Sequence, residues 1–340
     1  DRSPSRGLGD VYKRQGLYYS DEPDNGYRNY MELFLPSKKW NKEYIFARNQ
    51  GTGYSDNIHQ EKCMAANGMG GWSGLCPTQE LVDAYEMANG STPIIGYNAD
   101  GTPIINGASG YSETGFAATA GKHYPAGVYN MYVGREPRFY ASINFNGQQW
   151  RGRQLEFWQG GKDGINVSKV DYCCTGYLLR KTADEGVDVI NGKGGMKEAS
   201  ILFRVGSLYL DYAEALNEAE GPVDDVYKYV DAIRKRAGLP GLAKGLDKDK
   251  MRERIQHERQ IELAFEAGHR YFDCHRWKIA EKTDNGYMHG MNITATNKVD
   301  YSKRSTVGDS RVFEKKHYLF PIPQSEMDKR IGLVQSPYWE

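Results

Sequence analysis

The stretch ILFRVGSLYLDYAEALNEAEGPVDD, residues 201–225, decides the fold of this chain. Apolar residues such as Leu208 and Tyr212 recur in it every three or four positions, and acidic residues lie between them. This spacing predicts an amphipathic helix that begins at the start of the stretch and packs one face on a core. Gly221 and Pro222 then predict that the helix ends and that a second helix begins after a short reversal.

Two more helices follow this stretch. The second carries Val230 and Ala237 inward and ends near Gly238, and Asp247 can cap a third helix that runs toward Gly268. The chain also has 39 glycines and 25 tyrosines, so long aromatic-bearing loops must connect the helices. We therefore predict a mainly α fold built from helical hairpins, with long irregular loops and a few short strands.

The third helix carries acidic residues on its apolar side. Glu258 and Glu262 lie on the same arc as Met251 and Ile255, which marks the inner face of the helix. A buried carboxylate without a partner would be very costly, and Arg234 lies on the inner arc of the second helix. We therefore predict a buried ion-pair network that joins Glu258 or Glu262 to Arg234 or to another nearby arginine.

Several blocks of the sequence resemble the SusD/RagB family. In the helical part these blocks are ILFRVGSLYLDYAEALNEAEGP, VDAIRKRAGLP and ERQIELAFEAGHRYFDCHRW, which occupy residues 201–222, 230–240 and 258–277. Further blocks agree in order, namely PTQELVDAYEMANG, REPRFYASINFNG, TGYLLRK and HYLFPIPQSEMDKRIGLVQSPYW, at residues 77–90, 135–147, 175–181 and 317–339. Together they resemble the C-terminal region of the family.

The resemblance implies a fold and a function. The helical hairpins would be of the tetratricopeptide type, and the protein would bind an oligosaccharide or polysaccharide as a nutrient at the outer membrane surface of a Bacteroidetes-type cell. Its partner there would be a SusC-like TonB-dependent transporter, and a lipid anchor missing from this chain would attach it to the membrane. A peptide-capturing member of the family and a glycan-active hydrolase are the alternatives.

The resemblance also divides the chain. Residues 1–15 have no apolar periodicity, and we expect them to be a non-native leader. Residues 16–340 would form the C-terminal domain of the family, so that the N-terminal half is missing.

A short strand is expected within this domain. Apolar and polar residues alternate from Arg138 to Phe145, and this pattern predicts a strand.

Charge and composition exclude other classes of function. The chain has 44 basic and 44 acidic residues, and a formal net charge of zero argues against binding to nucleic acid. No apolar run approaches the roughly 20 residues that span a bilayer. Among five cysteines, Cys63 and Cys76 flank a Gly-rich loop, and either a disulfide or two reduced thiols would suit them.

The glutamates of the third helix do not predict catalysis. Glu258, Glu262 and Glu266 lie on one helix beside arginines, whereas glycoside hydrolysis needs two carboxylates across a cleft. Neighbouring arginines would hold these carboxyls ionised, which does not suit a general acid. We therefore expect no enzymatic activity, no transition metal and no cofactor, and only calcium on loop oxygens stays open.

The remaining candidates are aromatic residues in loops. Sugar rings stack their C–H faces on large flat side chains, and nearby polar groups bind the hydroxyls. The residues that meet this loop criterion are Trp72, Trp158, Tyr111, Tyr54 and Trp150. We predict that at least two of them converge on one exposed patch, because glycines beside them let the backbone approach a ligand.

Overall fold

The computed structural model describes residues 15–38, 40–49, 54–165, 170–192, 199–266, 268–329 and 331–339. Its α-helices are α2 (Gly26–Leu33), α3 (Tyr54–Met64), α4 (Gln79–Ala84), α5 (Pro137–Ser142), α6 (Val205–Glu220), α7 (Asp224–Arg236), α8 (Lys248–Glu262), α9 (His269–Arg276), α10 (Ala280–Thr283), α11 (Lys298–Tyr301) and α12 (Gln324–Met327). Short 3-10 helices are η1 (Pro36–Lys38), η2 (Asn67–Met69), η3 (Asn130–Tyr132) and η4 (Lys315–Tyr318).

The strands of the described residues form separate two-stranded antiparallel ribbons. They are β1 (Tyr44–Asn49) with β8 (Ala199–Arg204), β2 (Ile94–Tyr97) with β3 (Pro103–Ile105), β4 (Ile143–Phe145) with β7 (Tyr177–Leu179), β5 (Gln149–Trp150) with β6 (Arg153–Gln154), and β9 (Gly286–Met291) with β10 (Arg304–Arg311). The fold is therefore mainly helical with a few short strands, as the sequence predicts.

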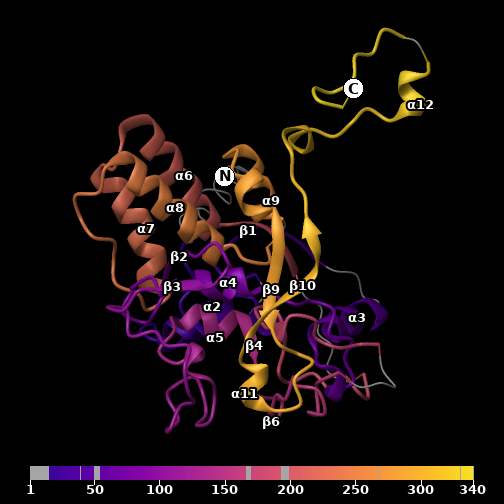
Figure 1. The fold of residues 1–340 in the computed structure, drawn as a ribbon. Coiled ribbons are helices and arrows are strands. Elements are labelled where there is room, and N and C mark those ends of the chain that lie inside the picture. The colour runs from indigo at the N-terminus through magenta and orange to yellow at the C-terminus, as the bar shows by residue number, and fades with distance from the viewer. Residues whose placement is uncertain are drawn as a thin grey trace, which may run out of the picture.

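Helices α6, α7 and α8 pack on one another and form the helical part of the body (Figure 1). Val226, Val230, Met251 and Ile255 are fully buried between them. The Asp247 side chain accepts a hydrogen bond of 2.8 Å from the backbone N–H of Lys250 and so caps α8. The predicted hairpins are present in this region.

The structure corrects the ends and the faces of these helices. The stretch begins as strand β8, and α6 starts only at Val205. Leu208 and Tyr212 are 54% and 44% exposed, because Leu210 and Ala213 face the core instead. Helix α8 ends at Glu262, after which the chain turns through a left-handed residue, Phe265, with φ of 63°.

The segment expected to be a strand at residues 138–145 is partly helical. Pro137 occupies the first turn of α5, where its missing N–H and fixed φ suit a helix, and only Ile143–Phe145 is extended. Alternation of apolar residues failed as a guide here because this short helix is buried on all sides. Phe139, Tyr140 and Phe145 lie in an aromatic core together with Tyr132.

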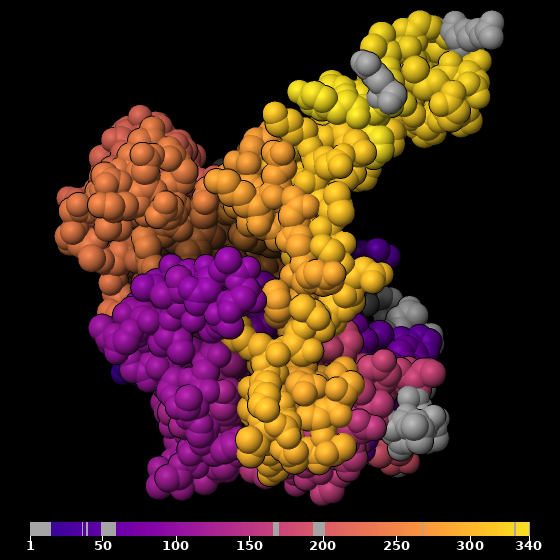
Figure 2. Space-filling model, in the orientation of Figure 1, coloured from indigo at the N-terminus to yellow at the C-terminus, as the bar shows by residue number. Residues whose placement is uncertain are grey.

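The ribbon of β9 and β10 crosses the front of the body and leads into the C-terminal arm (Figure 1). After β10 the chain leaves the body, and α12 stands apart from it (Figure 2). At the root of the arm, the ring of His275 lies 5.3 Å from Phe313 and 5.6 Å from Tyr318. In the part of the chain that the structure describes, no helix combines the length and apolar character needed to cross a membrane.

Candidate functional site

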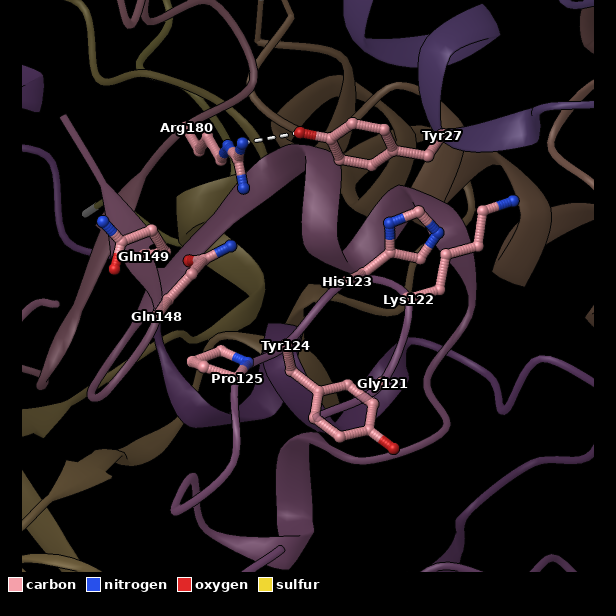
Figure 3. A pocket seen from close by; sticks show the side chains of 9 residues that line it. All are labelled: Tyr27, Gly121, Lys122, His123, Tyr124, Pro125, Gln148, Gln149 and Arg180. Atoms are coloured by element: carbon pink, nitrogen blue, oxygen red, sulfur yellow. Dashed lines mark hydrogen bonds between the residues drawn. The ribbon is translucent and has the colours of Figure 1, made fainter. Parts of the chain in front are cut away.

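A surface pocket with a volume of about 320 Å³ lies where α2, the loop before η3 and the β4–β5 turn meet (Figure 3). We call it the Tyr124 pocket, and its lining residues are Tyr27, Gly121, Lys122, His123, Tyr124, Pro125, Gln148, Gln149 and Arg180. Helix α2 contributes the first of these, strand β5 contributes Gln149, the end of β7 leads to Arg180, and loops contribute the others. Residues distant in sequence therefore build one site.

Stacked rings form one side of the pocket. The rings of Tyr27 and His123 are 4.8 Å apart with an interplanar angle of 29°, and His123 lies 5.2 Å from the ring of Tyr140. Tyr124 also stacks on Tyr140, at 6.1 Å and 25°. Because Tyr140 is buried in α5, it anchors both loop rings from behind. Such rigid aromatic side chains provide flat apolar surface.

Gln148 supplies an unused hydrogen-bond donor. Its side chain is 2% exposed, and its Oε1 accepts a hydrogen bond of 3.2 Å from the backbone N–H of Phe145. Its Nε2 atom is buried and has no hydrogen-bond partner. Figure 3 shows this amide turned toward the space between Arg180 and Tyr124. A buried donor without an acceptor costs about 1–3 kcal/mol, so an acceptor atom of a ligand would relieve it.

Arg180 is held firmly in the wall of the pocket. Its Nη2 donates to the Tyr27 hydroxyl at 2.5 Å, and its Nη1 donates to the carbonyl of Tyr140 at 2.9 Å. The guanidinium lies 4.6 Å from the ring centre of Trp150, and its Nε has no hydrogen-bond partner. These contacts therefore fix the guanidinium of Arg180 in place and leave its Nε–H without an acceptor.

The rings of His123 and Tyr27 are uncharged at neutral pH. Burial, together with the positive charges of Lys122 and Arg180, lowers the pKa of His123 to about 4. Burial also raises the pKa of Tyr27. The rings therefore present neutral faces, and the charge of the pocket comes from Lys122 and Arg180.

Two of the predicted loop aromatics do not fit ligand stacking. Tyr111 is 6% exposed, and its hydroxyl donates to Glu113 at 2.6 Å while Arg135 lies over its ring. Trp150 is 3% exposed in β5. The expectation that they belong to an exposed patch is wrong, because both rings pack into the core behind the loops. Trp150 instead supports Arg180 from inside.

The other predicted aromatics lie in different surroundings. Trp72 is 39% exposed, and its ring lies 5.3 Å from that of His59 with Lys62 above it. Trp158 is partly buried against the aromatic core, with Lys298 5.2 Å from its ring centre. Tyr54 begins α3, but its side chain lies outside the described residues. The grouping of Trp72 and Trp158 on one patch stays a prediction.

The acidic residues of α8 make the buried ion pairs that the sequence predicts. Arg234 lies 3.1 Å from Glu258, with side-chain exposures of 2% and 1%. The full cluster joins Glu43, Glu86, Glu136, Glu258, Glu262 and Glu266 to Arg138, Arg204, Arg234, Arg236, Arg254 and Lys181. Its formal charges cancel, and none of its members lines the Tyr124 pocket. The cluster therefore holds the body together.

The chemistry of the pocket is neither that of a metal centre nor that of a disulfide, because its polar groups are amides, cations and rings. Across the described ranges, no three His, Cys, Asp or Glu side chains come together in a way that could hold a metal ion. Cys63 and Cys76 are free thiols, and the Sγ of Cys76 lies 3.7 Å from that of Cys173. The lining of the Tyr124 pocket contains no cysteine, and its functional groups are aromatic rings and hydrogen-bond donors.

The sequence offered little signal for this pocket. The segment Gly121-Lys-His-Tyr-Pro125 combines a turn with aromatic and basic residues, and this pattern is typical of a binding loop. Its partners Tyr27, Gln148 and Arg180 are far from it in sequence, and only the fold brings them together.

Comparison with known proteins agrees with this fold. The family model described as the SusD family matches residues 36–339. Two curated relatives from Formosa agariphila are SusD-like protein P25, 42% identical over 82 residues, and SusD-like protein P2, 29% identical over 154 residues. These matches cover 23% and 42% of this chain, and 15% and 26% of the relatives.

Solved structures from Bacteroides fragilis extend the likeness over almost the whole chain. A SusD-like protein is 29% identical with a TM-score of 0.70, and the match covers 98% of this chain and 61% of that chain. A SusD-like carbohydrate binding protein is 23% identical with a TM-score of 0.68, over 95% and 59% of the two chains, and shows the fold alone. Because the family model spans most of the sequence and the helical hairpins match in space, this chain belongs to the SusD family.

Proposed function

We propose that the Tyr124 pocket binds a sugar unit of a glycan, and that the protein captures glycans as nutrients at the surface of the outer membrane. One observation carries the proposal: the rings of Tyr27, His123 and Tyr124 line the same pocket as the amide nitrogen of Gln148, which has no hydrogen-bond partner. A pocket with flat apolar faces and a few fixed polar groups suits a sugar ring.

Each part of the pocket has a role in this proposal. The exposed face of Tyr124 would stack on the C–H face of a sugar, which contributes about 0.5–1.5 kcal/mol per ring by analogy with aromatic pairs. The Nε2 of Gln148 would donate to a hydroxyl or ring oxygen. A single such site gives weak affinity, so retention of a polysaccharide would depend on repeated engagement along its chain.

The family supports this choice of ligand. A solved protein of the same fold is named a carbohydrate binding protein. We extend the proposal to a SusC-like TonB-dependent transporter as the partner in uptake. A transporter gene beside the gene for this protein would support that part, and its absence there would count against it.

Retention in polysaccharide-containing native gels tests the ligand proposal. The wild type should be slowed by at least one polysaccharide of a diverse panel, and Tyr124→Ala should lose that retention while its melting curve still shows a folded protein. Tyr287→Ala is the matched control, because Tyr287 lies in β9, is 54% exposed and does not line the pocket. Equal retention of both variants would refute the assignment of the pocket.

The same material separates the alternatives. A hydrolase would release shorter oligosaccharides from the polysaccharide that slows it, and chromatography of the products would detect them. A peptide-capturing protein would bind members of a peptide library and none of the glycans. We expect that the glycans stay unchanged in length. We also expect no peptide binding that depends on Tyr124, as a comparison with Tyr124→Ala would show.

A further inference from the structure

We infer that the Tyr124 pocket selects saccharides that carry an anionic substituent, either the carboxylate of a uronic acid or a sulfate ester. This inference rests on the proposed function, since it names the class of sugar that the same site takes. It comes from the hydrogen-bond donors and the charges that line the pocket.

The buried side-chain atoms of the pocket lining that lack a hydrogen-bond partner are donors. The Nε2 of Gln148 and the Nε of Arg180 are buried without a hydrogen-bond partner. In the described part of the chain, the ammonium of Lys122 also makes no hydrogen bond or ion pair, and Figure 3 shows it at the rim, turned outward on its flexible stem. Carboxylates and sulfates are acceptors only, so they match such a set better than a hydroxyl does.

The lining carries positive charge without compensation. None of the residues that line the pocket is an aspartate or a glutamate. Among the described ion pairs Arg180 takes part in none, whereas the buried Arg138 and Arg204 each contact several carboxylates. A partly buried guanidinium that is fixed in place and lacks a carboxylate suits an anion from outside.

Two carboxylates, Glu22 and Glu185, interact electrostatically with residues of the pocket, and both are engaged elsewhere. Glu22, whose pKa Lys122 helps to lower, lies 2.5 Å from Arg28 and accepts a hydrogen bond from Asn25. Glu185 accepts a hydrogen bond of 3.2 Å from the backbone N–H of Arg151. Neither lines the pocket, so neither occupies the position that a ligand anion would take.

His123 reports the same positive potential from within the pocket. Burial is the largest cause of its lowered pKa, and Lys122 and Arg180 lower it further. A neutral imidazole beside the two cations adds no charge of its own at neutral pH. The positive field of the pocket therefore acts on a ligand over the whole physiological range of pH.

Matched pairs of polysaccharides test the inference. Amylose is compared with amylose oxidised at C6 to carboxylates, and agarose with a sulfated galactan, by native gel retention and by calorimetry with the corresponding oligosaccharides. We expect the wild type to bind one of the anionic polymers more tightly than its neutral counterpart, and rising salt to reduce this difference. The arm that responds distinguishes a carboxylate from a sulfate ester.

Variants place the effect in the pocket. Lys122→Gln should lower the affinity for the anionic polymer by about two- to fivefold, as for an exposed ion pair. Lys282→Gln is the matched control, because Lys282 is an exposed lysine of α10 outside the lining, and it should have no effect. Arg180→Gln should lower the affinity by about tenfold or more, provided that its melting curve shows a folded protein.

The outcomes separate this inference from the proposed function. Equal binding of neutral and anionic polymers, both lost in Tyr124→Ala, would overturn the anionic preference and keep glycan binding. Binding of sodium acetate or sodium sulfate alone as tightly as the oligosaccharide would overturn the saccharide part. An unchanged preference in both Lys122→Gln and Arg180→Gln would show that the preference arises outside this pocket and would overturn the inference.

Discussion

The guanidinium of Arg138 donates a hydrogen bond of 2.5 Å to the carboxylate of Glu258, across 120 residues of sequence. The two side chains are 0% and 1% exposed, and Arg138 also contacts Glu136 and Glu262. Helix α5, which packs behind the Tyr124 pocket, is thereby tied to α8 of the helical hairpins. The ion cluster positions the wall of the site relative to the body.

Removal of one partner from this cluster should destabilise the fold strongly. Arg234 contacts Glu258 at 3.1 Å and Glu86 at 2.9 Å, so Arg234→Ala removes one cation from each of these buried carboxylates and leaves the cluster with an excess negative charge. We expect a loss of about 3–5 kcal/mol in the free energy of unfolding, measured by chemical denaturation. Lys250→Ala, which breaks an exposed pair with Asp247, should cost less than about 1 kcal/mol. Equal effects of the two variants would contradict a structural role for the cluster.

Stability in alkaline solution should depend on Lys181. Burial lowers the pKa of Lys181 to about 8, against about 10.5 in the unfolded chain. Between these values the unfolded state binds more protons, so the free energy of unfolding should rise with pH in this window. Lys181→Met removes this contribution. The wild type should therefore gain stability relative to that variant from pH 8 to pH 10, and a constant difference in denaturation midpoints would refute the lowered pKa.

A methyl group at Gly121 should disturb the pocket without a change in the fold. A Cβ atom there would clash with the Cζ of Tyr124, so Gly121→Ala must displace the ring. We expect this variant to lose polysaccharide retention at an unchanged melting temperature. Gly107→Ala is the control, because a Cβ at Gly107 meets nothing within 4 Å. Full retention by Gly121→Ala would show that the position of the Tyr124 ring does not matter.

Trp72 and Trp158 give a competing prediction from the sequence. If they form a carbohydrate platform, the double variant Trp72→Ala/Trp158→Ala should lose retention while its melting temperature stays almost unchanged. Trp72 presents exposed surface, but Trp158 packs against the aromatic core, so its truncation should also lower stability. Retention that survives in the double variant and disappears in Tyr124→Ala would decide for the pocket.

Helical periodicity and charge placement predicted the part of the fold that depends on local pattern. Glu258 and Arg234 could be paired from the sequence because both lie on inner arcs of neighbouring helices. Face assignments were less secure, as Leu208 shows, because apolar residues occur on several sides of α6 and a shift of about half a turn, two residues, exchanges the buried side for the exposed one. The predicted strand near Arg138 became helical because Pro137 opens a helical turn.

The pocket itself could not be read from the sequence. Loop position made Trp150 a candidate for ligand contact, whereas the structure buries it beneath Arg180. Tyr124 lies in a loop of the same composition and is stacked on Tyr140 at the surface. Exposure of an aromatic residue in a loop depends on long-range contacts, and these have no local signature.

The central claim is that a saccharide occupies the space beside Gln148. The most direct measurement follows the side-chain amide signals of Gln148 and Gln149 by NMR, assigned through Gln148→Leu and Gln149→Leu, during titration with an oligosaccharide of the polysaccharide that slows the wild type. These signals should shift on addition of the sugar, whereas the side-chain amide signals of Gln324, on the distant arm, should not. Unmoved Gln148 and Gln149 signals together with a shifted indole signal of Trp72 would contradict the central claim.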